Sequence, residues 1–481
     1  MDILNTISET FAESFPGMPA YVVGGTVRDM LTGRTVGDID LVVGGDVRPV
    51  VEELAEVLGG TAFLMDPERD VWRVTVKDGR LAQVDISPLK GGIEADLAGR
   101  DFTVNAMAIE LKEQRPSLTP GPSPGRRGEN DGAIIDPYGG RGDIQAGVIR
   151  ALGSTVFEAD PLRAMRAFRF AGQLGFSIDR ETLSCIREHA PSITKVSAER
   201  VRDELYAVIE GGRAVAAFRA MFGAGVLCEV MPEAGGMEGV PQGEPHAYGL
   251  LEHSLKAMEY AEEVSSDPGR WFGGRAAEVS GYLDARLDGG LSARGLVKLC
   301  AFLHDVGKPS CLRREEGRLR YTGHEEAGAL MCEAIASRLK MSERASRALA
   351  AVTRGHMRPL HLTHGAPSRR AVYRYVRDMG EELPASLIVA LADAMATRER
   401  AEETATDVEG LVPVIAEYYY GEYARARVEP LVTGRDLIDV FGLEPGPVFR
   451  ELLEGVDEMR AEGVISDRAD ALRFVREKLS G

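Results

Sequence analysis

The chain has 481 residues and a net charge of −18, from 57 basic and 75 acidic side chains. Its length predicts about three domains, and its 44% hydrophobic and 27% charged residues are typical of an ordinary soluble protein. No apolar run approaches the ~18 residues of a membrane span, so we expect no membrane partner. Five scattered cysteines exclude a disulfide framework and a CxxC zinc site, which favours a cytoplasmic location. The acidic balance argues mildly against a nucleic-acid binder, unless a local basic face exists.

After a predicted lead-in helix in residues 1–20, the chain reaches a segment that predicts a strand, a glycine turn, a helix and a second strand. Its sequence from Tyr21 to Val43 is YVVGGTVRDMLTGRTVGDIDLVV. Gly24 and Gly25 end the first strand, where the backbone must turn sharply or approach a ligand. We expect Thr26 to cap the helix that follows.

Two aspartates lie at the start of the second predicted strand. Asp38 and Asp40 are two residues apart, so a strand presents both on one face. Adjacent carboxylates need a compensating cation, and Mg²⁺ is commonly held by carboxylates together with substrate phosphates. Arg28 and the N–H groups of the glycine turn would bind phosphate. Either motif alone is more often a loop or a solvated face, but their ordered combination predicts a site for a metal-bound triphosphate.

This segment resembles motif A of the class II tRNA nucleotidyltransferase and bacterial poly(A) polymerase family. The resemblance implies that Gly25 and Arg28, with Gly24 beside them, bind the nucleotide, and that Asp38 and Asp40 are catalytic and hold Mg²⁺. It also implies an α+β fold, in which a nucleotidyltransferase (polymerase β-like) α/β head precedes a helical neck, an HD-type helical domain and a helical tail.

The remainder of the head is predicted to contain a helix over 50–58 and strands over 71–76 and 81–86. Asp85 is either a third carboxylate of the metal pair or a polar residue on a half-exposed strand. The sequence RDFTVNA from Arg100 resembles motif B of the family, which implies that Arg100 contacts the nucleotide and that Asp101 lies by the sugar. Residues 113–130, rich in Pro, Gly, Ser and Arg, predict a disordered insertion.

An arginine-rich helix follows the head, in the sequence ADPLRAMRAFRF. Its arginines recur every three residues and therefore share one face, which by itself is most often a solvated face. The helix resembles the family's EDxxR motif, whose Asp and Arg read the edge of the incoming base. The resemblance implies a nucleotide-binding role for Asp160, Arg163, Arg166 and Arg169. Ala159 stands where the family usually has Glu, a departure that bears on the selection between CTP and ATP.

A further helix is predicted to begin at Ser197, as its cap, and resembles the ERIxxEL segment that braces the neck. Beyond it, histidines and aspartates are spread over several predicted helices, and His304-Asp305 precedes Gly307-Lys308. Imidazole and carboxylate ligands suit a divalent transition metal, which generates a nucleophile for phosphoester hydrolysis. The segment resembles the HD phosphohydrolase domain, and this implies the ligands His253, His304, Asp305, His324, His356 and Asp393. A degenerate HD fold that only positions RNA is the alternative.

The predicted organisation is a head over 1–152, a helical neck over 153–235 that reads the base and binds RNA, an HD domain over 245–400 and a tRNA-binding helical tail over 410–481. Residues 273–290, rich in Gly, Ala and Asp, predict a loop between two of the HD ligands.

The resemblance implies a tRNA nucleotidyltransferase that adds CCA from CTP and ATP to the tRNA 3′ end without a template. Within the same class, a poly(A) polymerase or an enzyme adding only C or only A would share every motif. In another class, an HD phosphohydrolase with an RNA-binding head is possible from these residues. A non-enzymatic RNA-binding protein is the weakest reading, because the carboxylate pair and the metal-type ligands would lack a purpose.

Overall fold

The computed structural model describes residues 3–78, 80–111, 134–365, 367–397 and 402–480. The chain divides into two compact units. The first comprises residues 1–196 and 224–226, and the second comprises residues 197–223 and 227–481. The predicted insertion at 113–130 lies outside the described residues.

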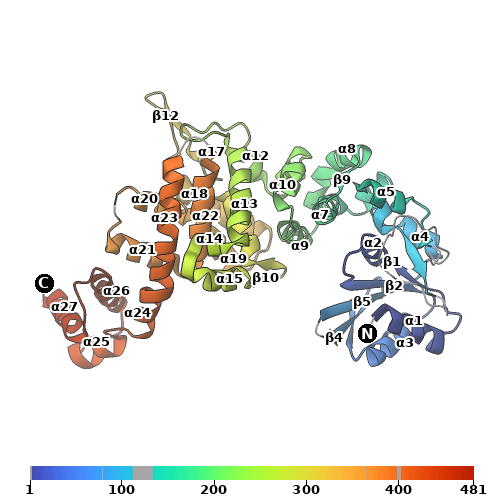
Figure 1. The fold of residues 1–481 in the computed structure, drawn as a ribbon, viewed down its shortest axis with the longest axis horizontal. Coiled ribbons are helices and arrows are strands. Elements are labelled where there is room, and N and C mark those ends of the chain that lie inside the picture. The colour runs from blue at the N-terminus through green and yellow to red at the C-terminus, as the bar shows by residue number, and fades with distance from the viewer. Residues whose placement is uncertain (1–2, 79, 112–133, 366, 398–401, 481) are drawn as a thin grey trace. The chain divides into compact units, whose positions relative to one another are not determined.

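The first unit contains a mixed sheet in the order β3-β4-β5-β2-β1-β6-β7 among the described residues (Figure 1). Its central strands β2 (Asp38–Val43) and β5 (Arg80–Pro88) run parallel, whereas β1 (Ala20–Val23) is antiparallel to both of its neighbours, β2 and β6 (Ala108–Glu110). The outer strands are β3 (Thr61–Asp66), β4 (Val71–Asp78) and β7 (Ile134–Ile135).

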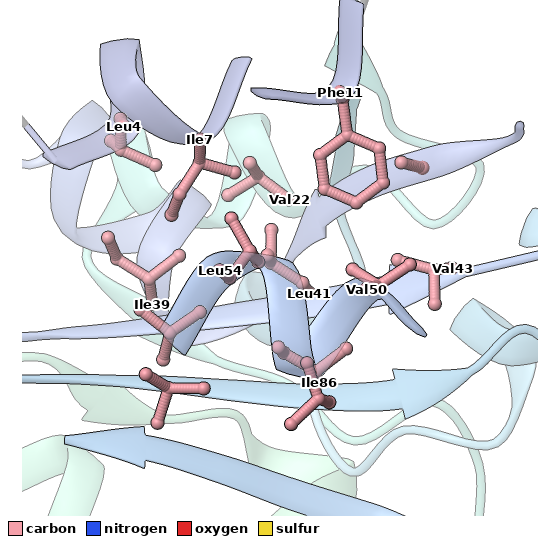
Figure 2. Packing of buried hydrophobic residues seen from close by; sticks show 14 of the residues in the cluster. Leu4, Ile7, Phe11, Val22, Ile39, Leu41, Val43, Val50, Leu54 and Ile86 are labelled. Atoms are coloured by element: carbon pink, nitrogen blue, oxygen red, sulfur yellow. The ribbon is translucent and has the colours of Figure 1, made fainter. Parts of the chain in front are cut away.

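Helices α1 (Ile3–Ser14) and α3 (Val47–Val57) pack on one face of this sheet, which confirms the two predicted helices. Leu4, Ile7 and Phe11 of α1 meet Val50 and Leu54 of α3 over the apolar side chains of the central strands (Figure 2). Burial of these side chains supplies the main stabilisation of the unit, at roughly 25 cal/mol per Å² of apolar surface.

Strand alternation places the carboxylates on the opposite face. Ile39 and Leu41 belong to the core under α1 and α3, so Asp38 and Asp40 project to the other side of β2. On that side, Val42 packs with Val23, Ala108 and Leu97 of α4 (Ile93–Ala98).

The remainder of the first unit is mainly helical. It includes α5 (Gly140–Ala146), α6 (Thr155–Ala159), α7 (Arg163–Leu174) and α8 (Arg180–His189), and the short parallel pair β8 (Val148–Ile149) and β9 (Ser177–Ile178). Helix α7 is the predicted arginine helix, and its apolar side buries Met165, Phe168 and Phe170.

The second unit is built mainly of helices. It begins with α9 (Ala198–Ile209) and α10 (Ala214–Gly223) and continues with α13 (Leu250–Ser266), α16 (Ala293–Leu303), α18 (His324–Arg338), α19 (Glu343–Gly355) and α22 (Leu383–Thr397). The C-terminal helices α25 (Gly434–Phe441), α26 (Pro447–Ala461) and α27 (Arg468–Ser480) share a small core of their own. A mixed sheet in the first unit, followed by a mostly helical remainder, confirms the predicted α+β class.

Two local predictions for the second unit are wrong. Residues 273–290 are not a loop, because they contain α15 (Ala276–Leu283) and strand β10 (Arg286–Asp288), whose buried Val279 and Leu283 outweigh the local glycines. Ser197 does stand at the N-cap position of α9, but its side chain makes no capping hydrogen bond.

Candidate active site and candidate metal centre

The paired carboxylates of β2 lie beside a third on β5. Asp40 is in register with Asp85, and Asp85 accepts both guanidinium hydrogen bonds of Arg73, at 2.7 Å each. Asp85 is therefore neutralised by Arg73. In the described part of the chain, the carboxylates of Asp38 and Asp40 accept no hydrogen bond, and burial raises the pKa of both, with Asp85 adding to the effect. Two such carboxylates fit a hard divalent cation.

The glycine turn is shaped by Gly24 rather than by Thr26. Gly24 is the N-cap residue of α2 (Gly25–Leu31), with φ 68° and ψ −129°, a backbone conformation that L side chains rarely adopt. A Cβ at this position would lie 2.5 Å from Nη1 of Arg100 and 3.3 Å from Oδ2 of Asp40. The turn therefore brings the backbone against the guanidinium and the carboxylate at van der Waals range.

The predicted capping role of Thr26 is wrong, because Thr26 lies inside the first turn of α2. Its hydroxyl instead donates to the carbonyl oxygen of Asp38, at 3.2 Å, and accepts from the backbone N–H of Asp40, at 2.8 Å. These two bonds attach the helix to the strand that carries both aspartates, and so fix the distance between the glycine turn and the carboxylate pair.

A buried chain of hydrogen bonds joins three of the sequence motifs. Nη1 of Arg28 donates to Oδ1 of Asn105 at 2.7 Å, and Nδ2 of Asn105 donates to Oδ1 of Asp101 at 3.0 Å. Arg166 of α7 then donates to Oδ2 of Asp101 through Nε at 2.8 Å, with Nη2 at 2.7 Å. Burial alone would raise the pKa of Asp101, but Arg166 and the hydrogen bonds from Asn105 and Phe102 outweigh it and hold that pKa below its usual value.

The ring of Phe170 lies close to the guanidinium groups of three arginines, two of which belong to this chain of hydrogen bonds. The guanidinium carbons of Arg169, Arg28 and Arg166 lie 4.3, 5.0 and 5.3 Å from its centroid, within the range of a cation–π contact. Phe170 is buried and also packs edge-on against Phe102. Thus one aromatic side chain supports guanidinium groups from both α2 and α7.

The other predicted nucleotide ligands lie around this network. Arg100 donates from Nε and Nη2 to Asp96, at 3.1 and 2.9 Å. Oδ1 of Asp160 accepts from the backbone N–H of Leu162 at 3.2 Å, and Nη2 of Arg163 donates to the carbonyl of Gly99 at 2.8 Å. The first unit therefore brings together the two aspartates and the arginines of three motifs, and their contact with a nucleotide stays a prediction.

The second unit gathers all six predicted HD ligands into one buried cluster. Nε2 of His253 lies 2.9 Å from Oδ1 of Asp393, and Nε2 of His304 lies 3.1 Å from Oδ2 of Asp305 and 3.6 Å from Oδ1 of Asp393. On the other carboxylate oxygen of Asp305, Nε2 of His324 lies at 3.2 Å and Nε2 of His356 at 3.5 Å.

Three of these imidazoles share one orientation. Nδ1 of His304, His324 and His356 lies 2.7 to 2.9 Å from the carbonyl oxygen three residues earlier. Because a carbonyl can only accept, each Nδ1 carries the proton and each Nε2 faces the cluster, as in metal-bound histidines. Among the described residues, these three Nε2 atoms and Oδ1 of Asp305 are buried without a hydrogen-bond partner.

Electrostatics in the cluster favour a bound cation. Burial alone would lower the pKa of His304, yet Asp305 and Asp393 raise that pKa to about 10. The pKa of Asp305 is held well below its usual range, against the effect of burial, chiefly by His304 and Lys308. Buried carboxylates that hold a proton on an imidazole so strongly would accept a divalent metal in its place, so the residues present fit a metal.

Several residues of these sites were missed from the sequence. Asn105 and Phe170 are part of quoted motifs, but their contacts reach far along the chain and leave no local signal. Lys308 was seen only as part of a motif, and its Nζ lies 2.5 Å from Oδ2 of Asp305. His246 is not among the predicted ligands, yet its ligand atom lies within 4.8 Å of those of His253 and Asp393, and burial lowers its pKa to about 4.

Three protein-family models match successive parts of the chain. A model described as "Poly A polymerase head domain" matches residues 20–150, and one described as "Probable RNA and SrmB- binding site of polymerase A" matches residues 175–236. A model of the HD domain matches residues 250–398. Within the described residues, no helix is both long enough and apolar enough to cross a membrane.

Curated relatives match over almost the whole chain. An "A-adding tRNA nucleotidyltransferase" of Deinococcus radiodurans is 32% identical, and the match covers 95% of each chain. A "CC-adding tRNA nucleotidyltransferase" of Geobacter sulfurreducens is 30% identical, over 96% of this chain and 92% of the relative. A solved structure, "The complex structure of CCA-adding enzyme with CTP", has the same fold, with a TM-score of 0.67 at 22% identity, covering 100% of this chain and 96% of the other. The chain therefore belongs to the tRNA nucleotidyltransferase family and carries the HD domain.

Proposed function

We propose that this nucleotidyltransferase adds CCA, from CTP and ATP, to the 3′ end of tRNA, with Asp38 and Asp40 as its Mg²⁺ ligands. The observation that supports this most is the pair of carboxylates that accept no hydrogen bond from any described residue, next to a glycine turn that ends against Arg100. When bound there, Mg²⁺ would neutralise the triphosphate and lower the pKa of the attacking 3′-hydroxyl.

The residues of the chain itself would bind and orient the nucleotide. Arg28 and Arg100 are our proposed phosphate ligands, since each presents a guanidinium near Asp40. Asp160 and Arg163 are proposed to match the base edge through complementary donors and acceptors, so that side chains replace a template. In this proposal, Asp101 and Arg166 act mainly on each other, and their ion pair holds α7 in place against the sugar side of the site.

A partial activity is the second candidate, favoured by one specific observation. The relatives from Deinococcus radiodurans and Geobacter sulfurreducens, which match almost the full chain, are named as A-adding and as CC-adding enzymes. The substitution of the usual Glu by Ala159, next to the proposed base-reading Asp160, is compatible with a narrowed nucleotide choice.

Sizing the products of nucleotide addition tests both candidates. Transcripts of one tRNA that end before the CCA, after C and after CC would each be incubated with CTP, with ATP and with both. Addition of C, C and A followed by a stop supports the full activity. A stop after CC, or addition of A only to the transcript that ends in CC, would reassign the enzyme to a partial activity, and a long A tail would make it a poly(A) polymerase.

We also propose that the HD cluster binds a divalent transition metal and hydrolyses phosphoesters, with His253, His304, Asp305, His324, His356 and Asp393 as ligands. The inward-facing Nε2 atoms, which have no hydrogen-bond partner within the described ranges, support this over a degenerate HD fold that only positions RNA. The neck and tail would hold the tRNA mainly through its backbone and shape. The cytoplasm remains our proposed compartment, in keeping with five free cysteines.

A further inference from the structure

One histidine at the edge of the HD cluster is not among the six predicted ligands. His246 lies in the segment that precedes α13, and its ring packs edge-on against that of His253, with 5.0 Å between centroids. Single ligand atoms of His246, His253 and Asp393 all lie within 4.8 Å of one another. Two imidazoles and one carboxylate at that spacing can surround a divalent cation.

His246 is oriented in the same way as the cluster's other histidines. Its Nδ1 lies 3.2 Å from the carbonyl oxygen of Gly243, three residues earlier, as for His304, His324 and His356. The carbonyl again requires the proton on Nδ1, which leaves Nε2 as the lone-pair donor. Packing against His253 alone would not require the proton of His246 to be on Nδ1.

The segment that carries His246 is attached to the cluster. Oε1 of Gln242 accepts a hydrogen bond from Lys308 at 2.6 Å, and the hydroxyl of Tyr321 donates to the carbonyl of Pro241. Nε2 of Gln242 is buried and has no partner among the described residues. The segment is therefore held at the cluster by Lys308, which also contacts Asp305.

We infer that His246, His253 and Asp393 form an additional position for a divalent metal, adjacent to the ligands that surround Asp305. The inference rests on the proposed metal binding of the HD cluster and extends it by one ion. Because one imidazole nitrogen ligates a single ion, His253 is assigned to this additional position, and the two oxygens of Asp393 allow that carboxylate to serve both positions. His246 is partly exposed, whereas the other histidines of the cluster are buried, so the additional ion would occupy the accessible side of the cluster. There it would be placed to bind an oxygen of a phosphoester.

Metal stoichiometry tests the inference without relying on activity. The parent is the full chain with Asp38→Asn and Asp40→Asn, so that the head does not bind metal. The protein is stripped with a chelator, loaded with Mn²⁺, desalted, and its manganese is measured by mass spectrometry. His246→Phe keeps an aromatic ring against His253 but cannot ligate, and His246→Glu keeps a ligand but loses the ring. His361→Phe is the matched control, since His361 belongs to none of the ligand groups in the described residues.

We expect His246→Phe to bind one Mn²⁺ fewer than the parent, and His246→Glu and His361→Phe to match the parent. If His246→Phe binds as much Mn²⁺ as the parent, His246 is a packing residue and the additional position does not exist. If the parent itself binds no Mn²⁺, the metal centre proposed for the HD cluster fails as well, and the two failures are thereby distinguished. Thermal unfolding followed by circular dichroism verifies that each variant is folded.

Discussion

Replacing Gly24 with Ala should destabilise the head, whereas the same change at Gly25 should not. At Gly24, an L residue would adopt φ 68° and ψ −129°, which costs about 1–3 kcal/mol. The new Cβ would also lie 2.5 Å from Nη1 of Arg100 and force the guanidinium away from Asp96. Loss of that hydrogen-bonded pair adds about 1 kcal/mol, for a total of roughly 2–4 kcal/mol.

Gly25 is the matched control because it is the neighbouring glycine in the same turn. A Cβ there would meet Nη2 of Arg28 at 3.5 Å and Oδ2 of Asp40 at 3.7 Å, which are ordinary contacts. Gly25 is the first residue of α2, and Ala is favoured over Gly in a helix by up to about 1 kcal/mol. Gly25→Ala should therefore leave the free energy of unfolding unchanged or slightly increased.

The assay uses the chain's two tryptophans, one in each unit. In a Trp271→Phe background, Trp72 on β4 is the sole tryptophan, and it packs against the core of the head. Urea unfolding followed by Trp72 fluorescence then reports the head alone. Equal urea midpoints for Gly24→Ala and Gly25→Ala would refute the reasoning, because both the backbone strain and the contact with Arg100 would then be without effect.

Three further predictions follow from the first unit. Asp101→Asn should cost about 2 kcal/mol at pH 7, because it removes the charged partner from the ion pair with Arg166. The folded pKa of Asp101 is lowered, so this contribution is present above the unfolded value of 3.8 and is lost as the pH falls through the folded pKa. The difference between the urea midpoints of wild type and variant should therefore shrink as the pH is lowered below 3.8, and a difference that does not change with pH would contradict this prediction. Phe170→Leu should raise KM for the nucleotide several-fold in steady-state kinetics, because three guanidinium groups lose the aromatic ring that supports them. Phe168→Leu on the same helix is the control: Phe168 contacts no guanidinium in the described part of the chain, so this variant should leave KM unchanged. Ala159→Glu should sharpen discrimination between CTP and ATP, and an unchanged ratio of kcat/KM values would contradict the proposed base-reading role of this segment.

The parts of the fold that depend on local patterns were predicted from the sequence. The strand from Asp38 to Val43 was predicted at its observed bounds, because its isoleucine and valine residues are β-branched and favour a strand. The six HD ligands were predicted from the resemblance to the HD domain, and the structure gathers them from segments up to 140 residues apart, as between His253 and Asp393.

The parts that were not predicted depend on distant partners. Threonine is a residue type that often caps helices, but the hydrogen bonds of Thr26 to the backbone of Asp38 and Asp40 depend on the packing of α2 on β2. Asn105 gains its role from Arg28, 77 residues away. The helix at 276–283 forms in a glycine-rich stretch because Val279 and Leu283 are buried by the rest of the unit. In each case tertiary packing determines the contact or the helix that forms, and the spacing of residues in the sequence does not indicate this packing.

We propose that nucleotide transfer takes place at the carboxylates of the head and does not depend on the HD cluster. The most direct test measures addition of radiolabelled CMP and AMP to tRNA by the wild type, by Asp38→Ala and by His304→Ala. We predict that Asp38→Ala abolishes addition, whereas His304→Ala retains the wild-type rate and loses only hydrolysis of a phosphoester substrate. Continued addition by Asp38→Ala, or loss of both activities in either variant, would contradict the account.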